Sequence, residues 1–170
     1  MTVLKIFLVI AVSLVLQTTL ARFLVRGSTG VDLVLVGVTY LGLTTGPVAG
    51  LLAGTIAGLA QDSLGTGVLG IGGLSKTVVG FLAGIIGTAF IVSQPIPRFL
   101  VFFGATWVEM LITGGLHAML DPQPAPISWA GIFARALGNA LVGVVVFQFI
   151  EAVPGMMERR RAMGRVRSRR

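Results

Sequence analysis

The stretch Thr44-Thr45-Gly46-Pro47-Val48-Ala49-Gly50-Leu51-Leu52-Ala53-Gly54-Thr55-Ile56-Ala57-Gly58 decides how this chain folds. It lies inside a long apolar region, residues 31–60. As one helix this region would measure ~45 Å, well beyond a bilayer hydrocarbon core of ~30 Å. Because proline interrupts the interior of a helix, Gly46-Pro47 predicts that the region divides into two short helices.

The same stretch places a glycine at every fourth position: Gly46, Gly50, Gly54 and Gly58. On a helix this spacing produces one smooth stripe, and the alanines at 49, 53 and 57 lie on an overlapping face. In lipid, stripes of small residues allow two helix backbones to approach closely. We expect the stripe to pack either against another helix of this chain or against the helix of a partner protein.

The rest of the chain has the composition of a polytopic α-helical membrane protein. Hydrophobic residues make up 55% and charged residues 11% of the sequence, whereas a soluble domain carries about 25% charged residues. The mean hydropathy is +0.96. The clearest apolar runs are residues 3–24, 74–93, 98–120 and 130–153, with proline-rich loops at 93–98 and 121–126. We expect one all-α transmembrane domain, residues 1–157, of six helices, with five as the alternative, followed by a basic tail, residues 158–170.

Positive charge is concentrated in that tail, which holds seven of the 13 basic residues, while the other six are balanced by the 6 acidic ones. The positive-inside rule therefore predicts a cytoplasmic C-terminus. Anionic lipid is the expected partner of the tail, and nucleic acid is not expected. Six helices also place the N-terminus inside but leave Arg22 and Arg26 outside, whereas five helices reverse this and put Lys5 outside.

Few residues are suited to catalysis or metal binding. The chain has no cysteine and one histidine, which rules out a disulfide or a thiol nucleophile and argues against a zinc centre. No motif brings a nucleophile and a base together. We therefore expect no catalytic residue, no metal and no cofactor, and a protein that is not an enzyme.

The segment from Gly58 to Thr77 has the most distinctive polar pattern. It closes one helix with Gln61-Asp62, turns through several glycines, and opens the next helix with Lys76 about one turn from its start. We expect Asp62 and Lys76 to meet. The pair would either brace a helical hairpin or form part of a ligand site.

Other polar residues fall inside the expected spans, where ionisable groups are costly and are functional candidates by default. We expect Glu109 to pair with Arg135, either as a brace between helices or in a functional role. We expect His117, near a helix end, to lie at the membrane–water interface with its hydrogen bonds satisfied. The possible polar cluster comprises Gln17, Lys76, Glu109, His117 and Arg135, with Asn139 as a further buried polar residue.

Several short segments, in a fixed order, carry a family resemblance. They are Leu16-Gln17-Thr18-Thr19-Leu20, Gly46-Pro47, Gly58-Leu59-Ala60-Gln61-Asp62-Ser63-Leu64, Leu69-Gly70-Ile71 and Lys76-Thr77-Val78-Val79-Gly80-Phe81-Leu82. Together they cover most of residues 8–93 and resemble the MreD family of bacterial rod-shape-determining proteins. The last two expected helices and the tail add little to this resemblance.

The resemblance implies a bacterial inner-membrane subunit of the elongasome, which maintains cell shape and directs peptidoglycan synthesis. Such a subunit is a scaffold rather than an enzyme. It binds the membrane-anchored protein MreC and works indirectly with actin-like MreB, the glycosyltransferase RodA and the transpeptidase partner of RodA. MreD-like chains are also similar to the six-helix S-components of energy-coupling-factor transporters, which hold a ligand in an outward-opening cavity.

Two functions from different classes follow. As a scaffold, the protein would grip a partner with its glycine stripe and with the outer loop shaped by Gln61 and Asp62. As a transporter subunit for a vitamin or another small molecule, it would line a polar cavity with Gln17, Asp62, Lys76, His117 and Arg135. The near absence of tyrosine and histidine offers little for binding a vitamin-sized ligand.

Overall fold

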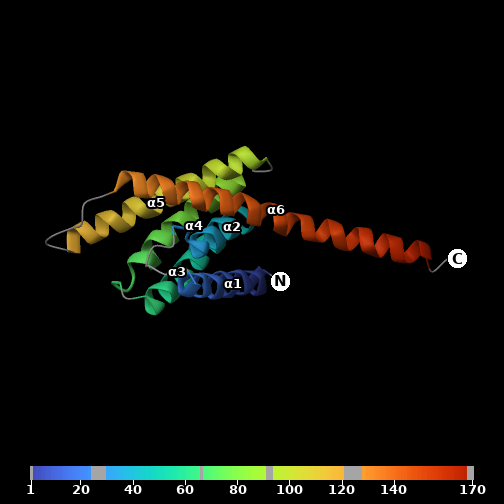
Figure 1. The fold of residues 1–170 in the computed structure, drawn as a ribbon, viewed down its shortest axis with the longest axis horizontal. Helices are drawn as coiled ribbons and strands as arrows, with labels where there is room; N and C mark the ends of the chain where they lie inside the picture. The colour runs from blue at the N-terminus through green and yellow to red at the C-terminus, as the bar shows by residue number, and fades with distance from the viewer. Residues whose placement is uncertain (1, 24–29, 66, 91–93, 121–127, 168–170) are drawn as a thin grey trace.

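A computed structural model describes residues 2–23, 30–65, 67–90, 94–120 and 128–167. These residues form six α-helices and no strand, which confirms the all-α class (Figure 1). The helices are α1 (Thr2–Phe23), α2 (Leu33–Thr45), α3 (Pro47–Leu64), α4 (Ile71–Ala89), α5 (Pro95–Leu120) and α6 (Trp129–Arg167).

The predicted division of residues 31–60 is confirmed at Gly46. Helix α2 ends at Thr45, and Pro47 occupies the first turn of α3, where its missing N–H is not needed. Gly46 has φ +96°, a left-handed region that glycine enters without strain. The chain therefore reverses sharply, and Gly50 lies against Gly42 across the turn.

The glycine stripe packs within the chain, which was the first of the two expected alternatives. A Cβ atom added at Gly50, Gly54 or Gly58 would overlap the backbone of α4. Helix α4 presents glycines of its own to the same interface, because a Cβ at Gly80 or Gly84 would overlap the backbone at Gly50 or Pro47. Two glycine faces thus bring α3 and α4 into close backbone contact, as small residues do between membrane helices.

Helix α2 lies at the centre of the bundle. Every residue from Val34 to Gly42 is buried, and α2 contacts each of the other five helices. Its start at Asp32 is buried too. A helix of 13 residues is ~20 Å long, so it does not reach through the full depth of a bilayer core. Its polar N-terminus is therefore satisfied inside the protein.

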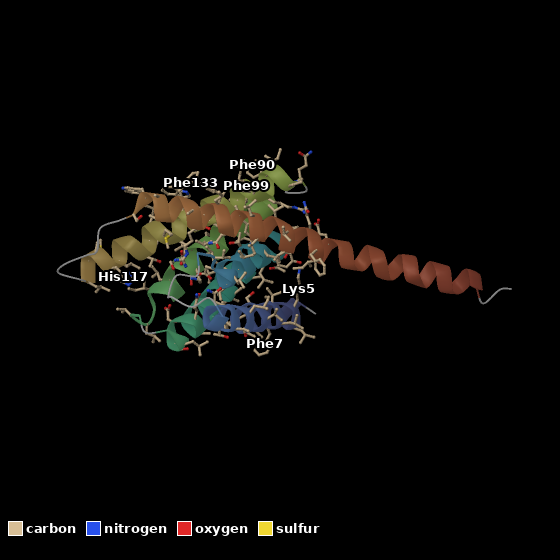
Figure 2. All side chains as sticks on the ribbon, in the orientation of Figure 1. Lys5, Phe7, Phe90, Phe99, His117 and Phe133 are labelled. Carbon is tan, nitrogen blue, oxygen red and sulfur yellow. The ribbon has the colours of Figure 1, made fainter. Side chains whose placement is uncertain are left out.

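The exposed surface is that of a membrane protein. Three helical segments are long and apolar enough to cross a bilayer: Ile71–Ala89, Pro95–Leu120 and Trp129–Glu151. Shorter apolar segments are Leu4–Thr19 in α1 and Leu33–Thr45, the whole of α2. Large apolar side chains such as Phe7, Phe90 and Phe133 are exposed and point outward from the bundle (Figure 2).

Helix α6 continues from the bundle into the basic tail as far as Arg167. Figure 1 shows this extension leaving the bundle from the end at which α1 begins. Lys5 lies near that end, and His117 lies near the opposite end (Figure 2). We call the end with His117 and the α3–α4 loop the hairpin end, and the end with Lys5 the tail end.

Candidate functional site

The start of α2 is built from side chains of three segments. Asp32 is the N-cap, and its Oδ1 accepts a hydrogen bond of 3.0 Å from the N–H of Leu35. Gln17 of α1 accepts from the N–H of Leu33 at 2.8 Å. Asn139 of α6 accepts from the N–H of Asp32 at 2.7 Å. These acceptors satisfy three N–H groups at a buried helix terminus.

Charged side chains meet at the same place. Lys76 Nζ lies 3.0 Å from Asp32 Oδ2 and 3.0 Å from Glu109 Oε1. Arg135 Nη2 lies 3.8 Å from Asp32 Oδ2. Asp32, Lys76 and Glu109 are all buried. Two basic and two acidic groups balance one another, so the buried charge is neutral overall, as burial in a poorly polar environment requires.

A hydrogen-bond chain continues from these charges into α5. Asn139 Nδ2 donates to Thr106 Oγ1 at 3.0 Å, and Thr106 Oγ1 donates to the carbonyl of Phe102 at 3.0 Å. Thr106 and Asn139 are completely buried. We define the polar centre as Gln17, Asp32, Lys76, Thr106, Glu109, Arg135 and Asn139. It links α1, α2, α4, α5 and α6.

The expected contact between Asp62 and Lys76 is wrong. Asp62 Oδ2 accepts hydrogen bonds from the N–H groups of Gly70 at 2.8 Å and Gly73 at 3.1 Å. A carboxylate at the end of α3 thereby caps the start of α4, whose free N–H groups attract negative charge. Lys76 points into the polar centre instead. The hairpin is braced by Asp62, but through backbone amides rather than an ion pair.

The expected pairing of Glu109 with Arg135 is also not what the structure holds. Glu109 pairs with Lys76, and Arg135 pairs with Asp32. Both residues belong to one cluster, as expected, but they are connected indirectly. The ion pair between Lys76 and Asp32 links Glu109 to Arg135. His117 is exposed and its Nδ1 lies 2.8 Å from the carbonyl of Thr113, so it lies outside the polar centre.

Of the residues expected to bind a partner or pack a helix, the glycines pack the bundle and Asp62 shapes the loop. Gln61 is half-buried, and its Oε1 has no hydrogen-bond partner among the described residues. The expected positions of Arg22 and Arg26 concern side chains outside those that the structure describes.

Sequence reasoning missed Asp32, the residue with the most connections in the polar centre. Its position directly before the apolar run of α2 is the signal for a helix N-cap, and this signal could have been recognised. The contacts of Asp32 with Lys76 and Asn139 carry no local signal, because these partners lie on other helices.

A second set of charges lies at the tail end. Lys5 Nζ donates to Thr44 Oγ1 at 3.2 Å and lies 5.0 Å from the centre of the Tyr40 ring. Arg98 Nη2 lies 2.8 Å from Glu151 Oε2, and its guanidinium carbon lies 4.0 Å from the centre of the Phe147 ring. Cations over aromatic faces are stabilised by the ring quadrupole. These contacts tie α1 to α2 and α5 to α6.

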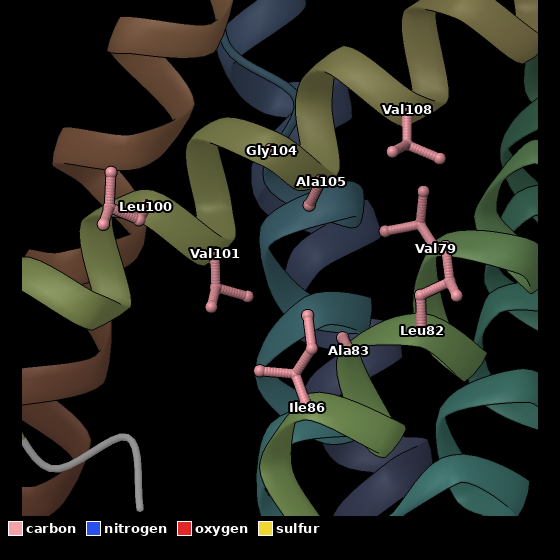
Figure 3. A pocket seen from close by; sticks show the side chains of 9 residues that line it. All are labelled: Val79, Leu82, Ala83, Ile86, Leu100, Val101, Gly104, Ala105 and Val108. Atoms are coloured by element: carbon pink, nitrogen blue, oxygen red, sulfur yellow. The ribbon is translucent and has the colours of Figure 1, made fainter. Parts of the chain in front are cut away.

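Two apolar cavities open on the sides of the bundle. One, of about 290 Å³, lies between α4 and α5, where Val79, Ala83, Gly104 and Val108 are among the lining residues (Figure 3). The other, of about 260 Å³, lies among α1, α2 and α6. Neither of these two cavities is lined by a residue of the polar centre. Within the described residues, no three His, Cys, Asp or Glu side chains are grouped to hold a metal ion.

Comparisons with family models, with curated proteins and with solved structures give no match to this chain. The resemblance to the MreD family therefore rests on the sequence segments themselves. The structure assigns local roles to several of them: Gln17 supports the start of α2, Gly46 makes the turn, and Asp62 caps α4.

Proposed function

We propose that this protein is a non-enzymatic subunit of the bacterial cell-elongation machinery, related to MreD, that binds and positions the membrane-anchored protein MreC. Through MreC it would act on MreB, RodA and the transpeptidase partner of RodA in peptidoglycan synthesis. The proposal rests on the ordered segments that resemble the family. It is supported by the places where those segments fall, because Gln17, Gly46, Asp62 and Lys76 all hold the bundle together.

The observation that carries the proposal is the apolar loop at the hairpin end. Leu64 is 65% exposed and Leu69 is 67% exposed, and Asp62 holds the far side of the loop through Gly70 and Gly73. A shaped loop that presents large apolar side chains is typical of a protein contact surface. The glycine stripe is not free for this role, because α4 already covers it. We therefore assign the contact with MreC to Leu64 and Leu69.

We also propose six membrane crossings in the bacterial inner membrane, with both chain ends in the cytoplasm. The tail end would then be cytoplasmic, which suits Lys5, Arg98 and the basic extension of α6 under the positive-inside rule. Short helices such as α2 would be accommodated by burial among their neighbours. Arg22 and Arg26 oppose this orientation, since they would lie on the outer side.

The transporter alternative would use a fold like that of the S-components, but it has less support from the side chains. The residues expected to line a polar cavity are largely bonded to other parts of the chain. Lys76 is held between two carboxylates, and Asp62 is held by two backbone amides. The two cavities described above are apolar, and a site for a polar vitamin needs several converging polar groups.

The test is capture of the chain by tagged MreC after co-expression and extraction in mild detergent, with the bound amount measured by mass spectrometry. The variant Leu64→Ser/Leu69→Ser replaces two exposed apolar side chains, one at the end of α3 and one in the loop. We expect capture to fall about tenfold, which corresponds to about 1.4 kcal/mol of binding free energy.

The matched control is Met119→Ser/Leu120→Ser, which removes two exposed apolar side chains at the same end of the bundle. This control should be captured like the wild type. Equal capture of the loop variant and the control would refute the loop assignment. Recovery of a tightly bound small molecule without MreC would favour the transporter alternative.

A further inference from the structure

Four buried polar atoms of α5 and α6 have no hydrogen-bond partner among the described residues: Trp107 Nε1, Glu109 Oε2, Thr113 Oγ1 and Arg135 Nε. The last three belong to the polar centre or to the next turn of α5. Glu109 and Thr113 lie four residues apart on α5 and therefore share one face of that helix. Buried polar atoms in proteins are almost always bonded to a protein group or to an ordered water molecule. These three atoms therefore point to a ligand.

The register of α5 and α6 brings the three atoms to adjacent levels of one interface. The two helices are antiparallel, because Phe102 meets Gly143 and Thr106 bonds to Asn139. One turn further towards the hairpin end, α5 presents Glu109 and α6 presents Arg135. Thr113 follows after another turn of α5.

The other side of the same interface is closed by aromatic rings. Phe103 contacts Phe133 with ring centres 5.6 Å apart, and Trp107 stacks on Trp129 at 6.2 Å. Helices α5 and α6 therefore have an aromatic side and a polar side. Phe133 and Trp129 are exposed on the apolar surface, and the Nε1 of Trp107 on this side is also without a hydrogen-bond partner among the described residues.

Exposure of the polar residues rises away from the buried ion pair. The side chain of Asp32 is 1% exposed and that of Glu109 is 6% exposed, whereas that of Arg135 is 31% exposed. His117, one turn beyond Thr113 on α5, is exposed. The polar face thus runs from the buried ion pair to the surface.

The charges and donors determine which ligand fits. Asp32 and Glu109 balance Lys76 and Arg135, so an added cation would meet two positive groups and an added anion would meet two negative ones. The unsatisfied set combines an acceptor on Glu109, a donor on Arg135 and a hydroxyl that does both on Thr113. A neutral molecule that both donates and accepts is required, and water has this property.

We propose that a water-filled crevice between α5 and α6 leads from the hairpin end to Glu109, with Thr113 in its wall and Arg135 at the level of Glu109. Water there completes the hydrogen bonds of the polar centre and makes the Lys76–Glu109 ion pair accessible from one face of the membrane. This inference is independent of MreC, because every group in it belongs to this chain.

Cysteine labelling tests the crevice directly, because the chain has no cysteine of its own. The single variants Thr113→Cys, His117→Cys and Leu111→Cys are reconstituted in lipid nanodiscs and treated with a charged, hydrophilic methanethiosulfonate reagent. Leu111 is the matched control: it is two residues from Thr113, on the opposite face of α5, and 53% exposed on the apolar surface.

We expect Thr113→Cys to react within about tenfold of the exposed His117→Cys and more than about tenfold faster than Leu111→Cys, because the reactive thiolate needs water and the reagent does not enter hydrocarbon. Thr113→Cys replaces a hydroxyl that has no hydrogen-bond partner among the described residues with a thiol of similar size, so folding should be retained, as circular dichroism would verify. All three variants should react fully in SDS. Reaction of Thr113→Cys at the slow rate of Leu111→Cys would overturn the proposal, whether or not MreC is captured.

Discussion

Gly54 is the position at which the close packing of α3 and α4 can be tested most sharply. A Cβ atom at Gly54 would overlap three backbone atoms: the carbonyl oxygen and carbonyl carbon of Lys76 and the amide nitrogen of Thr77. No rotation of a side chain can relieve this overlap, so α3 and α4 must separate. Separation would also move the backbone that carries Lys76 away from Asp32 and Glu109.

The magnitude of the Gly54→Ala effect follows from two opposing terms. Overpacking a filled interface costs about 1–3 kcal/mol, and a contact with rigid backbone belongs at the upper end of that range. Replacing glycine by alanine within a helix returns about 1 kcal/mol. We therefore expect Gly54→Ala to lower the free energy of unfolding by about 2 kcal/mol.

Gly104→Ala is the matched control, because a Cβ atom at Gly104 on α5 meets nothing within 4 Å. It should raise the free energy of unfolding by up to about 1 kcal/mol through helix propensity alone. The measurement is reversible unfolding in mixed detergent and SDS micelles, followed by far-ultraviolet circular dichroism. Equal stability of the two variants would refute the assignment of the glycine stripe to packing within the chain.

Two further predictions concern the charges. Lys76→Met leaves Asp32 and Glu109 buried together without their shared cation and should lower the free energy of unfolding by about 3–5 kcal/mol, whereas Lys5→Met should change it by less than about 1 kcal/mol; a Lys76→Met protein as stable as Lys5→Met would contradict the role of the polar centre. For topology, reporter fusions at residue 2 and after residue 170 should both report the cytoplasm, and an external signal at residue 2 would favour five crossings and bring Arg22 and Arg26 inside.

The helices were largely predictable because the signals that start and stop them are local. In lipid every backbone amide must be paired within the protein, so long apolar runs become helices regardless of what they later touch. The division at Gly46-Pro47 was predictable for the same reason, since a proline and a glycine act on the residues beside them. The extent of α6 was not anticipated, because the arginines of the tail marked charge and not the end of the helix.

The polar centre was predictable only as a set of residue types. Gln17, Lys76, Glu109, Arg135 and Asn139 were recognised because polar groups stand out in apolar runs, and all of them lie in the polar centre. The pairings among these residues were not predicted correctly. Asp32 was not singled out from the sequence, because its burial follows from the position of the start of α2 inside the bundle.

The sequence by itself determined that this chain is an all-α membrane protein, that residues 31–60 divide at Gly46-Pro47, and that a smooth glycine face runs along α3. Only the tertiary structure decided that α4 covers this face and that Lys76 forms ion pairs with Asp32 and Glu109 rather than with Asp62. The physical reason is one of range. Hydrophobicity and backbone geometry act along a few residues, whereas the partner of a charge is chosen by how helices far apart in the chain pack, and a shift of one helix turn, ~5 Å, exchanges one partner for another.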